Sequence, residues 1–298
     1  MNLVLTVIQI TAPVFLLGAV GVIWRRVLHW EYPLQFVTRL AMTVAVPALI
    51  FTALMQAEIA PRALADLSLA ALAAYLAAAA AFWGVTAALG LDRRSYLAPL
   101  IFGNTGNIGL PLALFAFGEA GLSYAVVVFA VMALLTFTLG VWLVAGTASL
   151  GAVARDPVVL ATAAGGVFLW QGWRTPGWLT DALELAGQMA IPLMLITLGV
   201  AVAGLRPGRL GAAAGLSALK AALSAAVALG VAHLFALGPL ARAVLVVQFI
   251  TPVAVTSYLL AERYGADADA VAGLVVVSTV LALVSLPVAL GLLLPGLS

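Results

Sequence analysis

The chain has 298 residues, of which 65% are hydrophobic and 8% are charged, and its mean hydropathy is +1.21. A soluble domain carries about 25% charged residues, and a compact fold of this composition would leave too much apolar surface in contact with water. The composition therefore excludes a soluble protein and predicts a polytopic membrane protein. The 13 basic residues are scattered, which argues against a nucleic-acid surface, and the absence of cysteine excludes disulfides and thiolate chemistry.

Ten apolar runs predict ten transmembrane helices, so the fold class is all-α and the chain forms a single membrane domain over residues 1–298. The second and sixth runs are short, and each is expected to extend into its flanks. No basic residue precedes the first run, which is therefore expected to be a membrane span and not a cleaved signal peptide. The predicted spans are Leu3–Ile23, Leu40–Met55, Leu67–Gly90, Tyr96–Phe117, Leu122–Ala145, Val158–Gln171, Leu185–Leu205, Leu210–Leu237, Ala243–Ala261 and Ala270–Leu294.

The basic residues of the connections predict the orientation of these spans. Connections after even-numbered spans hold Arg62, Arg174 and Arg242. Since positive charge stays on the cytoplasmic side, both termini are expected outside the cytoplasm. The protein itself is expected in the cell (inner) membrane. Connections after odd-numbered spans hold the larger set: Arg25, Arg26, Arg39, Arg93, Arg94, Arg155, Arg206, Arg209 and Arg263.

The two halves of the chain share a sequence signature that predicts an internal repeat. Ala45-Val46-Pro47 in the second span matches Ala190-Ile191-Pro192 in the seventh, and Gly118 at the end of the fourth span matches Gly265 after the ninth. Repeats of approximately residues 1–148 and 149–298 would each contain five spans. Because five is odd, the halves must insert with opposite orientation, and inverted repeats of this kind are typical of secondary transporters.

The fourth and ninth spans each contain a segment that is unfavourable in a helix. The fourth includes Gly103–Pro111, with three glycines, two asparagines and a proline, and the ninth includes Gln248–Ser257. Such backbone survives in a membrane only where it is buried in protein or lines a cavity. Interrupted helices at matching positions predict a binding site near the midplane, and the amino ends of the half-helices favour a carboxylate or other anion. The candidate binding residues are Asn104, Thr105, Asn107, Pro111, Gln248, Thr251, Pro252 and Thr256.

These segments resemble the auxin efflux carrier family, which comprises the plant auxin exporters and their bacterial relatives. The resemblance is carried by Asn104-Thr105 before Gly109-Leu110-Pro111, by Leu198-Gly199, and by Gln248 and Pro252 before Ala261–Gly265. It implies a ten-span fold in which spans four and nine cross at Pro111 and Pro252. It also implies a scaffold of spans one, two, six and seven beside a transport domain of spans three to five and eight to ten. A homodimer, an elevator motion and an organic-acid substrate such as auxin or a dicarboxylate are further expectations of the resemblance.

Two charged residues inside the spans are candidates for coupling. Lys220 is the single lysine and lies about a third of the way along the eighth span, where a charge is costly unless it faces protein or water. It either acts beside the crossing helices or extends its ammonium to the cytoplasmic interface. Asp66 loosely matches an acidic residue that the resemblance links to this lysine, and it either pairs with Lys220 or caps its own helix.

The sequence leaves several functions open, although it favours transport. The spans lack an acidic cluster able to surround sodium, so transport that is proton-coupled or uncoupled is preferred to a sodium-coupled symporter of the bile-acid type. Neither H-E-x-x-H nor G-x-S-x-G occurs, which argues against an intramembrane enzyme. A channel is the other alternative. No metal or cofactor is expected, and the expected partners are the organic anion, membrane lipids and a second copy of the chain.

Overall fold

A computed structural model describes residues 3–146, 151, 154–208 and 210–297. Across these residues the chain is helical, and the one β-type contact is a bridge between Gly103 and Val253. Three segments, η1 (Ala41–Ala45), η2 (Thr105–Gly109) and η3 (Thr136–Gly140), are π-helical, and η4 (Leu294–Gly296) is a short 3-10 turn. The α-helices are α1 (Leu3–Arg26), α2 (Leu34–Leu40), α3 (Val46–Met55), α4 (Pro61–Ala88), α5 (Arg93–Ile101), α6 (Leu110–Leu135), α7 (Val141–Ala145), α9 (Pro157–Gln171), α10 (Gly177–Gln188), α11 (Ala190–Gly204), α12 (Leu210–Leu234), α13 (Pro239–Phe249), α14 (Val255–Tyr264) and α15 (Ala268–Leu293).

The described residues contain seven helical segments that are long and apolar enough to cross a membrane, together with two shorter apolar helices, α9 and α13. A polytopic membrane protein is therefore confirmed, whereas the count of ten spans stays a prediction. The second predicted span does extend into its flank, since its helical segment begins at Leu34. Arg39, which was expected in a connection, consequently lies inside α2.

Turn chemistry explains where several helices begin and end. Asp92 and Asp156 each accept hydrogen bonds from two backbone N–H groups of the following first turn, as N-cap residues do. Gly172 and Gly265 end α9 and α14 in the left-handed conformation, with φ of 66° and 67°. Gly118 has φ 66° and ψ −162°, so residues 105–145 are two helices joined at a break rather than one long helix.

Matching interruptions occur in the two halves of the chain. A π-helical segment ends just before Val46-Pro47, and α10 gives way to α11 just before Ile191-Pro192. Gly118 and Gly265, which align in the sequence, both have a positive φ, but their ψ angles differ, at −162° and 35°. The two halves therefore share the places of these interruptions but not one backbone conformation, and their relation as an inverted repeat stays a prediction.

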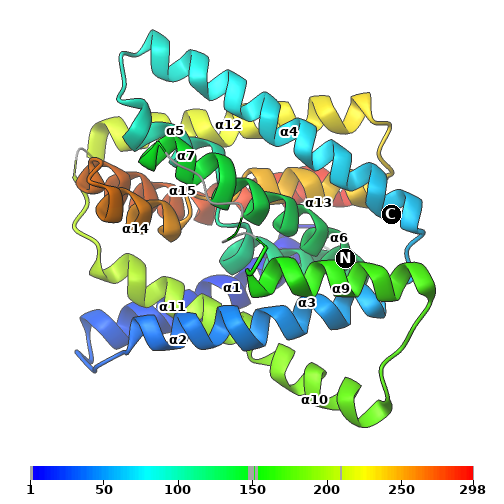
Figure 1. Cartoon of the computed structure of the whole chain (residues 1–298). Helices are drawn as coiled ribbons and strands as arrows, with labels where there is room; N and C mark the ends of the chain where they lie inside the picture. Colours follow the sequence, from blue (N-terminus) through cyan, green and yellow to red (C-terminus); the bar gives the residue numbers. More distant parts are fainter. Residues whose placement is uncertain (1–2, 147–150, 152–153, 209, 298) are drawn as a thin grey trace.

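The helices pack in two groups that meet near the centre of the molecule (Figure 1). In one group, α11 packs along α1, and α3 packs along both α9 and α10. In the other group, α12 packs against α4, α13 and α15, and α6 packs against α4 and α13. Gly21 and Gly199 allow the backbones of α1 and α11 to touch, because a Cβ at either position would overlap the facing main chain.

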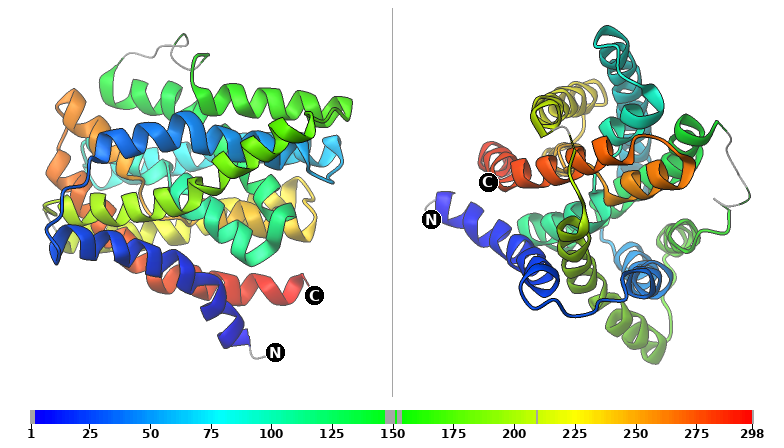
Figure 2. Two further views of the ribbon diagram at one scale, coloured as in Figure 1. Left: turned by 90° about the horizontal axis from the view of Figure 1, so that it is seen from below. Right: turned by 90° about the vertical axis from the view of Figure 1, so that its left-hand side faces the viewer.

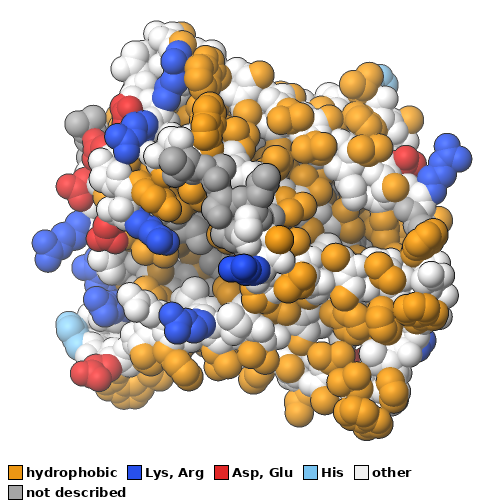
Figure 3. Space-filling model, viewed as in Figure 1, with side chains coloured by type: hydrophobic (Ala, Val, Ile, Leu, Met, Phe, Trp, Pro, Cys, Tyr) orange, Lys and Arg blue, Asp and Glu red, His pale blue; other side chains and the backbone are white. Residues whose placement is uncertain are grey.

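The helices run in roughly the same direction through the molecule, and their connections gather at two ends (Figure 2). The start of α1 and the end of α15 lie at the same end as the α3–α4, α9–α10 and α12–α13 connections (Figure 1). Charged side chains crowd the opposite end, and hydrophobic side chains dominate the surface between the two (Figure 3). Arg209, which was counted among the basic connections, lies outside the described residues.

Candidate functional site

The two interrupted helices meet at the centre of the fold through their non-helical segments. The first segment runs from Phe102 to Asn104, between α5 and η2, and the second runs from Ile250 to Ala254, between α13 and α14. Gly103 and Val253 form an antiparallel bridge, and the backbone N–H of Asn104 donates to the carbonyl of Pro252 at 2.7 Å. Each crossing segment therefore satisfies backbone groups of the other, as interrupted helices inside a membrane require.

Glycine is needed where the two crossing segments touch. A Cβ at Gly103 would overlap the Thr251 hydroxyl and would lie 3.1 Å from the Thr251 carbonyl oxygen. A Cβ at Gly109 would lie 2.8 Å from Cδ of Gln248. At Gly103 and Gly109, the interrupted segment of the fourth predicted span lies directly against Thr251 and Gln248 of the ninth. The two interrupted segments therefore adjoin.

Four buried polar side-chain atoms at this crossing have no hydrogen-bond partner among the described residues. They are Nδ2 of Asn104, Oγ1 of Thr105, and both Nε2 and Oε1 of Gln248. Asn104 is 4% exposed, and Thr105 and Gln248 are fully buried. Buried polar groups are nearly always paired, and an unpaired one costs about 1–3 kcal/mol. A cluster of them is therefore a place where a polar ligand would replace missing hydrogen bonds.

Asn104 occupies the N-cap position of the helix that continues through η2 and α6, yet its side chain makes no capping bond. Its backbone carbonyl instead accepts from the N–H groups of Ile108 and Gly109, at 3.1 and 3.3 Å. The amide of Asn104 is thus left free at the positive end of a helix, which favours a negatively charged group. The second amino end, that of α14, follows Ala254 and also has no side-chain cap.

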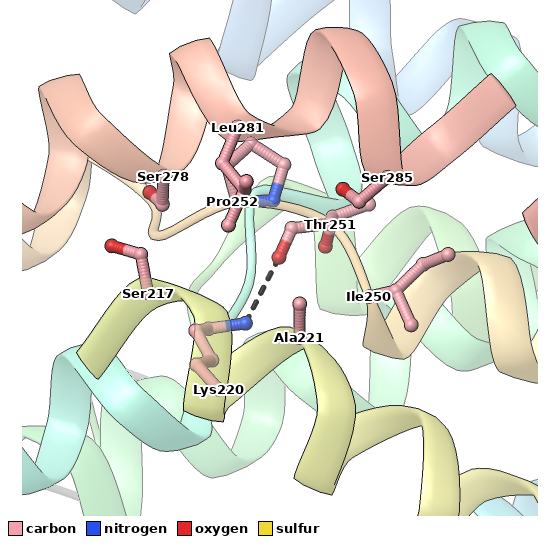
Figure 4. Close-up of a pocket in the computed structure, with 9 residues that line it drawn as sticks. All are labelled: Ser217, Lys220, Ala221, Ile250, Thr251, Pro252, Ser278, Leu281 and Ser285. Carbon is pink, nitrogen blue, oxygen red and sulfur yellow. Dashed lines mark hydrogen bonds between the residues drawn. The ribbon is translucent and has the colours of Figure 1, made fainter. Parts of the chain in front are cut away.

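Lys220 lies beside the second crossing segment and does not extend to the interface. Its side chain is 2% exposed, and its ammonium donates to the Thr251 carbonyl at 2.9 Å (Figure 4). Thr251 in turn donates its hydroxyl to the carbonyl of Gln248 at 2.6 Å. The ammonium therefore sits where α13 ends, at the negative end of the helix dipole. Of the two alternatives left open for this lysine, the position beside the crossing helices is the one observed.

Asp66 does not meet Lys220 in this structure. It is exposed and lines a pocket of about 290 Å³ together with Phe235–Ala241, beyond the end of α12. Lys220 is 14 residues before Leu234, which corresponds to about 20 Å along a helix. The alternative that Asp66 caps its helix is wrong as well, because α4 begins at Pro61 after Ala60.

The remaining predicted residues differ in burial. Pro252 is buried within the second crossing segment, and Asn107 is half-buried on η2. Pro111 is buried in the first turn of α6, beyond η2, so the first segment crosses at Phe102–Asn104 and the expectation that it crosses at Pro111 is wrong. Thr256 is exposed on α14 and lies outside the buried group.

Two residues that support the crossing were not predicted from the sequence. Ser278 of α15 accepts a hydrogen bond from the backbone N–H of Val253 at 2.9 Å. Tyr75 of α4 packs its ring against Phe249 and Phe102, with centroid distances of 4.4 and 5.9 Å, and its buried hydroxyl has no partner within the described residues. Tyr75 is the one tyrosine of the third predicted span, but nothing in the sequence indicates that it reaches the first crossing segment and the end of α13.

Residues 152–290 match a family model described as membrane transport protein. The matched range contains Lys220, Gln248 and the whole second crossing segment. This family is that of the auxin efflux carriers, and the matched range covers a little under half of the chain. The resemblance seen in the sequence is thereby confirmed, and the protein is a membrane transporter. No curated protein matches the chain.

Proposed function

We propose that this membrane transporter is a secondary transporter that carries a small organic anion with a carboxylate group. The observation that supports it most strongly is the buried group of unpaired amides and hydroxyl at Asn104, Thr105 and Gln248. These groups adjoin the amino end of a helix and supply hydrogen-bond donors without a fixed cation in contact with them. Such a site attracts a carboxylate yet allows it to leave, as transport requires.

We propose that the substrate reaches both sides by an elevator motion. The packing supports a division into a scaffold of α1–α3 and α9–α11, and a moving part that contains both crossing segments. Asn104 and Gln248 are shielded from solvent in this conformation, so a movement of helices must open the site. We also propose that the protein forms a homodimer through the scaffold. Its ten spans are proposed to form two inverted halves. In this arrangement, both termini lie outside the cytoplasm.

Lys220 is the proposed coupling residue. Its ammonium binds a carbonyl at the end of α13, a position where carbonyl oxygens would otherwise be available to a sodium ion. It either remains charged as a permanent substitute for a cation or exchanges a proton as the site opens. Both roles dispense with sodium. A sodium-coupled symporter is the second candidate, because the crossing segments carry other backbone carbonyls that could serve as ligands.

Uptake into liposomes that contain the purified protein tests these proposals. A panel of carboxylates is offered under an imposed pH gradient, an imposed sodium gradient, or neither. We expect saturable uptake of at least one carboxylate that does not require sodium, and Lys220→Gln is expected to remove any dependence on the pH gradient. Strict sodium dependence that survives in Lys220→Gln would contradict the role given to Lys220, and flux that never saturates would indicate a channel.

The orientation is tested separately with reporters at the C-terminus and in the connection that holds Arg93 and Arg94. We expect cytoplasmic activity from the second reporter alone. Cytoplasmic activity of the C-terminal reporter would contradict the proposed orientation.

A further inference from the structure

A small polar cavity lies beside Lys220. It has a volume of about 10 Å³, which is room for one atom-sized occupant such as a water molecule or a monatomic ion. The cavity lies between α12, the Ile250–Pro252 segment and α15 (Figure 4). Ser217 and Lys220 line it from one side, and Ser278 and Ser285 line it from the other.

Two of the groups that line this cavity have unused hydrogen-bond donors. The Lys220 ammonium has three N–H donors, and the Thr251 carbonyl is its one partner among the described residues. The Ser217 hydroxyl is 2% exposed and has no partner there either. The carbonyl of Thr251 is already used by Lys220, and the oxygen of Ser278 already accepts from Val253. An occupant of the cavity can therefore accept hydrogen bonds from the Lys220 ammonium and from the Ser217 hydroxyl.

The charge of Lys220 also lacks a balancing carboxylate. No acidic residue lines the cavity, and within the described part of the chain Lys220 forms no ion pair with Asp or Glu. A buried charge is costly unless it is paired. A carbonyl dipole offsets part of that cost, but it leaves a full positive charge enclosed between three segments of the protein.

We propose that this cavity binds a monatomic anion of the chloride type. Lys220 supplies the balancing charge, and Ser217 supplies a hydroxyl donor from the preceding turn of the same helix. A water molecule also has the right size and could donate to the serine oxygens, but it would leave the charge of Lys220 unbalanced. An organic acid is too large for the cavity, so this site is separate from the proposed substrate site at Asn104 and Gln248.

The proposed anion would hold the second crossing segment in place. It would keep the Lys220 ammonium charged and fixed, and that ammonium holds the Thr251 carbonyl on which the end of α13 depends. Because no organic substrate takes part, the site can be tested without transport. A failure of this proposal would leave the proposed transport function intact, and the reverse is also true.

The test is thermal unfolding of the detergent-solubilised full chain in sodium chloride, sodium bromide or sodium sulfate at matched ionic strength. We expect the Tm of the wild type to rise and saturate with chloride and bromide, and not with sulfate, which is too large. Lys220→Met should remove the halide-specific rise, and Ser217→Ala should raise the half-saturating chloride concentration about tenfold. Ser224→Ala is the matched control, because Ser224 is a buried serine of the same helix that does not line the cavity.

Chloride-35 NMR line broadening measures binding directly, so the test does not depend on the folding of Lys220→Met. We expect the wild type to broaden the chloride-35 signal and bromide to compete this broadening away. Ser217→Ala should broaden the signal less than the wild type does. An equal Tm in chloride and sulfate, or equal broadening by wild type and Ser217→Ala, would overturn the proposal and leave a water molecule as the occupant.

Discussion

The two crossing segments occupy corresponding places in the chain, but they are held in different ways. The second is anchored from outside: Lys220 binds the carbonyl of Thr251, Ser278 binds the N–H of Val253, and the Thr251 hydroxyl binds back to its own helix. The first is held mainly by the second, through the Gly103–Val253 bridge and the bond from Asn104 to Pro252. It leaves Nδ2 of Asn104 unpaired, and the hydroxyl of Thr105, the next residue, is unpaired as well.

This difference suggests that one crossing segment mainly stabilises the fold and the other mainly binds the ligand. Polar groups that are already paired stabilise the fold but have nothing left for a ligand, whereas unpaired ones cost stability and are available for binding. We therefore assign anchoring to the second crossing segment and substrate recognition mainly to the first. Gln248 is the exception, because both polar atoms of its amide are unpaired and it faces Gly109.

The largest effect is expected where the segments touch. Gly103→Ala would place a Cβ 3.1 Å from the Thr251 carbonyl oxygen and in overlap with its hydroxyl. Overpacking of this kind costs about 1–3 kcal/mol, and we expect a value near the top of that range because the hydroxyl and the carbonyl oxygen of Thr251 both lie against the new Cβ. Thermal unfolding in detergent measures it. Gly230→Ala is the control, since nothing lies within 4 Å of a Cβ there, and an equal Tm for the two variants would contradict the close contact.

The paired and unpaired threonines should respond oppositely to loss of the hydroxyl. Thr251→Val leaves the carbonyl of Gln248 without its 2.6 Å bond and is expected to cost about 1–3 kcal/mol. Thr105→Val removes a hydroxyl that has no partner, so stability should hold or rise while substrate affinity falls. Thermal unfolding and substrate binding of both variants are measured side by side. If Thr105→Val destabilised the protein as much as Thr251→Val does, the distinction between an anchoring segment and a ligand-binding segment would be wrong.

A smaller effect of opposite sign is expected at Gln248. Its amide is buried without partners, so Gln248→Met should raise the unfolding free energy of the substrate-free protein by about 1 kcal/mol. The same change should weaken substrate binding, because two polar atoms of the site are lost. A variant that is both less stable and equally active would show that Gln248 is paired during function.

Much of this arrangement was predictable from local sequence. Glycine, asparagine and proline within an apolar run disfavour a helix, so the places of both interruptions could be read from Gly103–Pro111 and Gln248–Ser257. The depth of Lys220 followed from its position in an apolar run. The second span does extend into its flank, as expected, but the extension includes Arg39, which had been assigned to a connection.

The anchors could not be predicted in the same way. Serine in an apolar helix commonly bonds to its own preceding turn, so Ser278 gave no sign that it accepts from Val253. Tyr75 reaches Phe102 and Phe249 only because three segments distant in sequence pack together. Asp66 was linked to Lys220 by resemblance alone, and the length of α12 between them decides against that contact in this conformation.

The most direct test of the central assignment is substrate binding by Asn104→Ala. The change removes an amide that is 4% exposed and unpaired, so thermal stability without substrate should be nearly unchanged. A carboxylate that raises the Tm of the wild type should no longer do so for Asn104→Ala, and saturable uptake into liposomes should be lost with it. The neighbouring Asn107→Ala, at a half-buried position of η2, serves as the control and should retain both to a large extent. Binding and uptake that persist in Asn104→Ala at wild-type affinity would contradict the assignment and place the substrate elsewhere in the molecule.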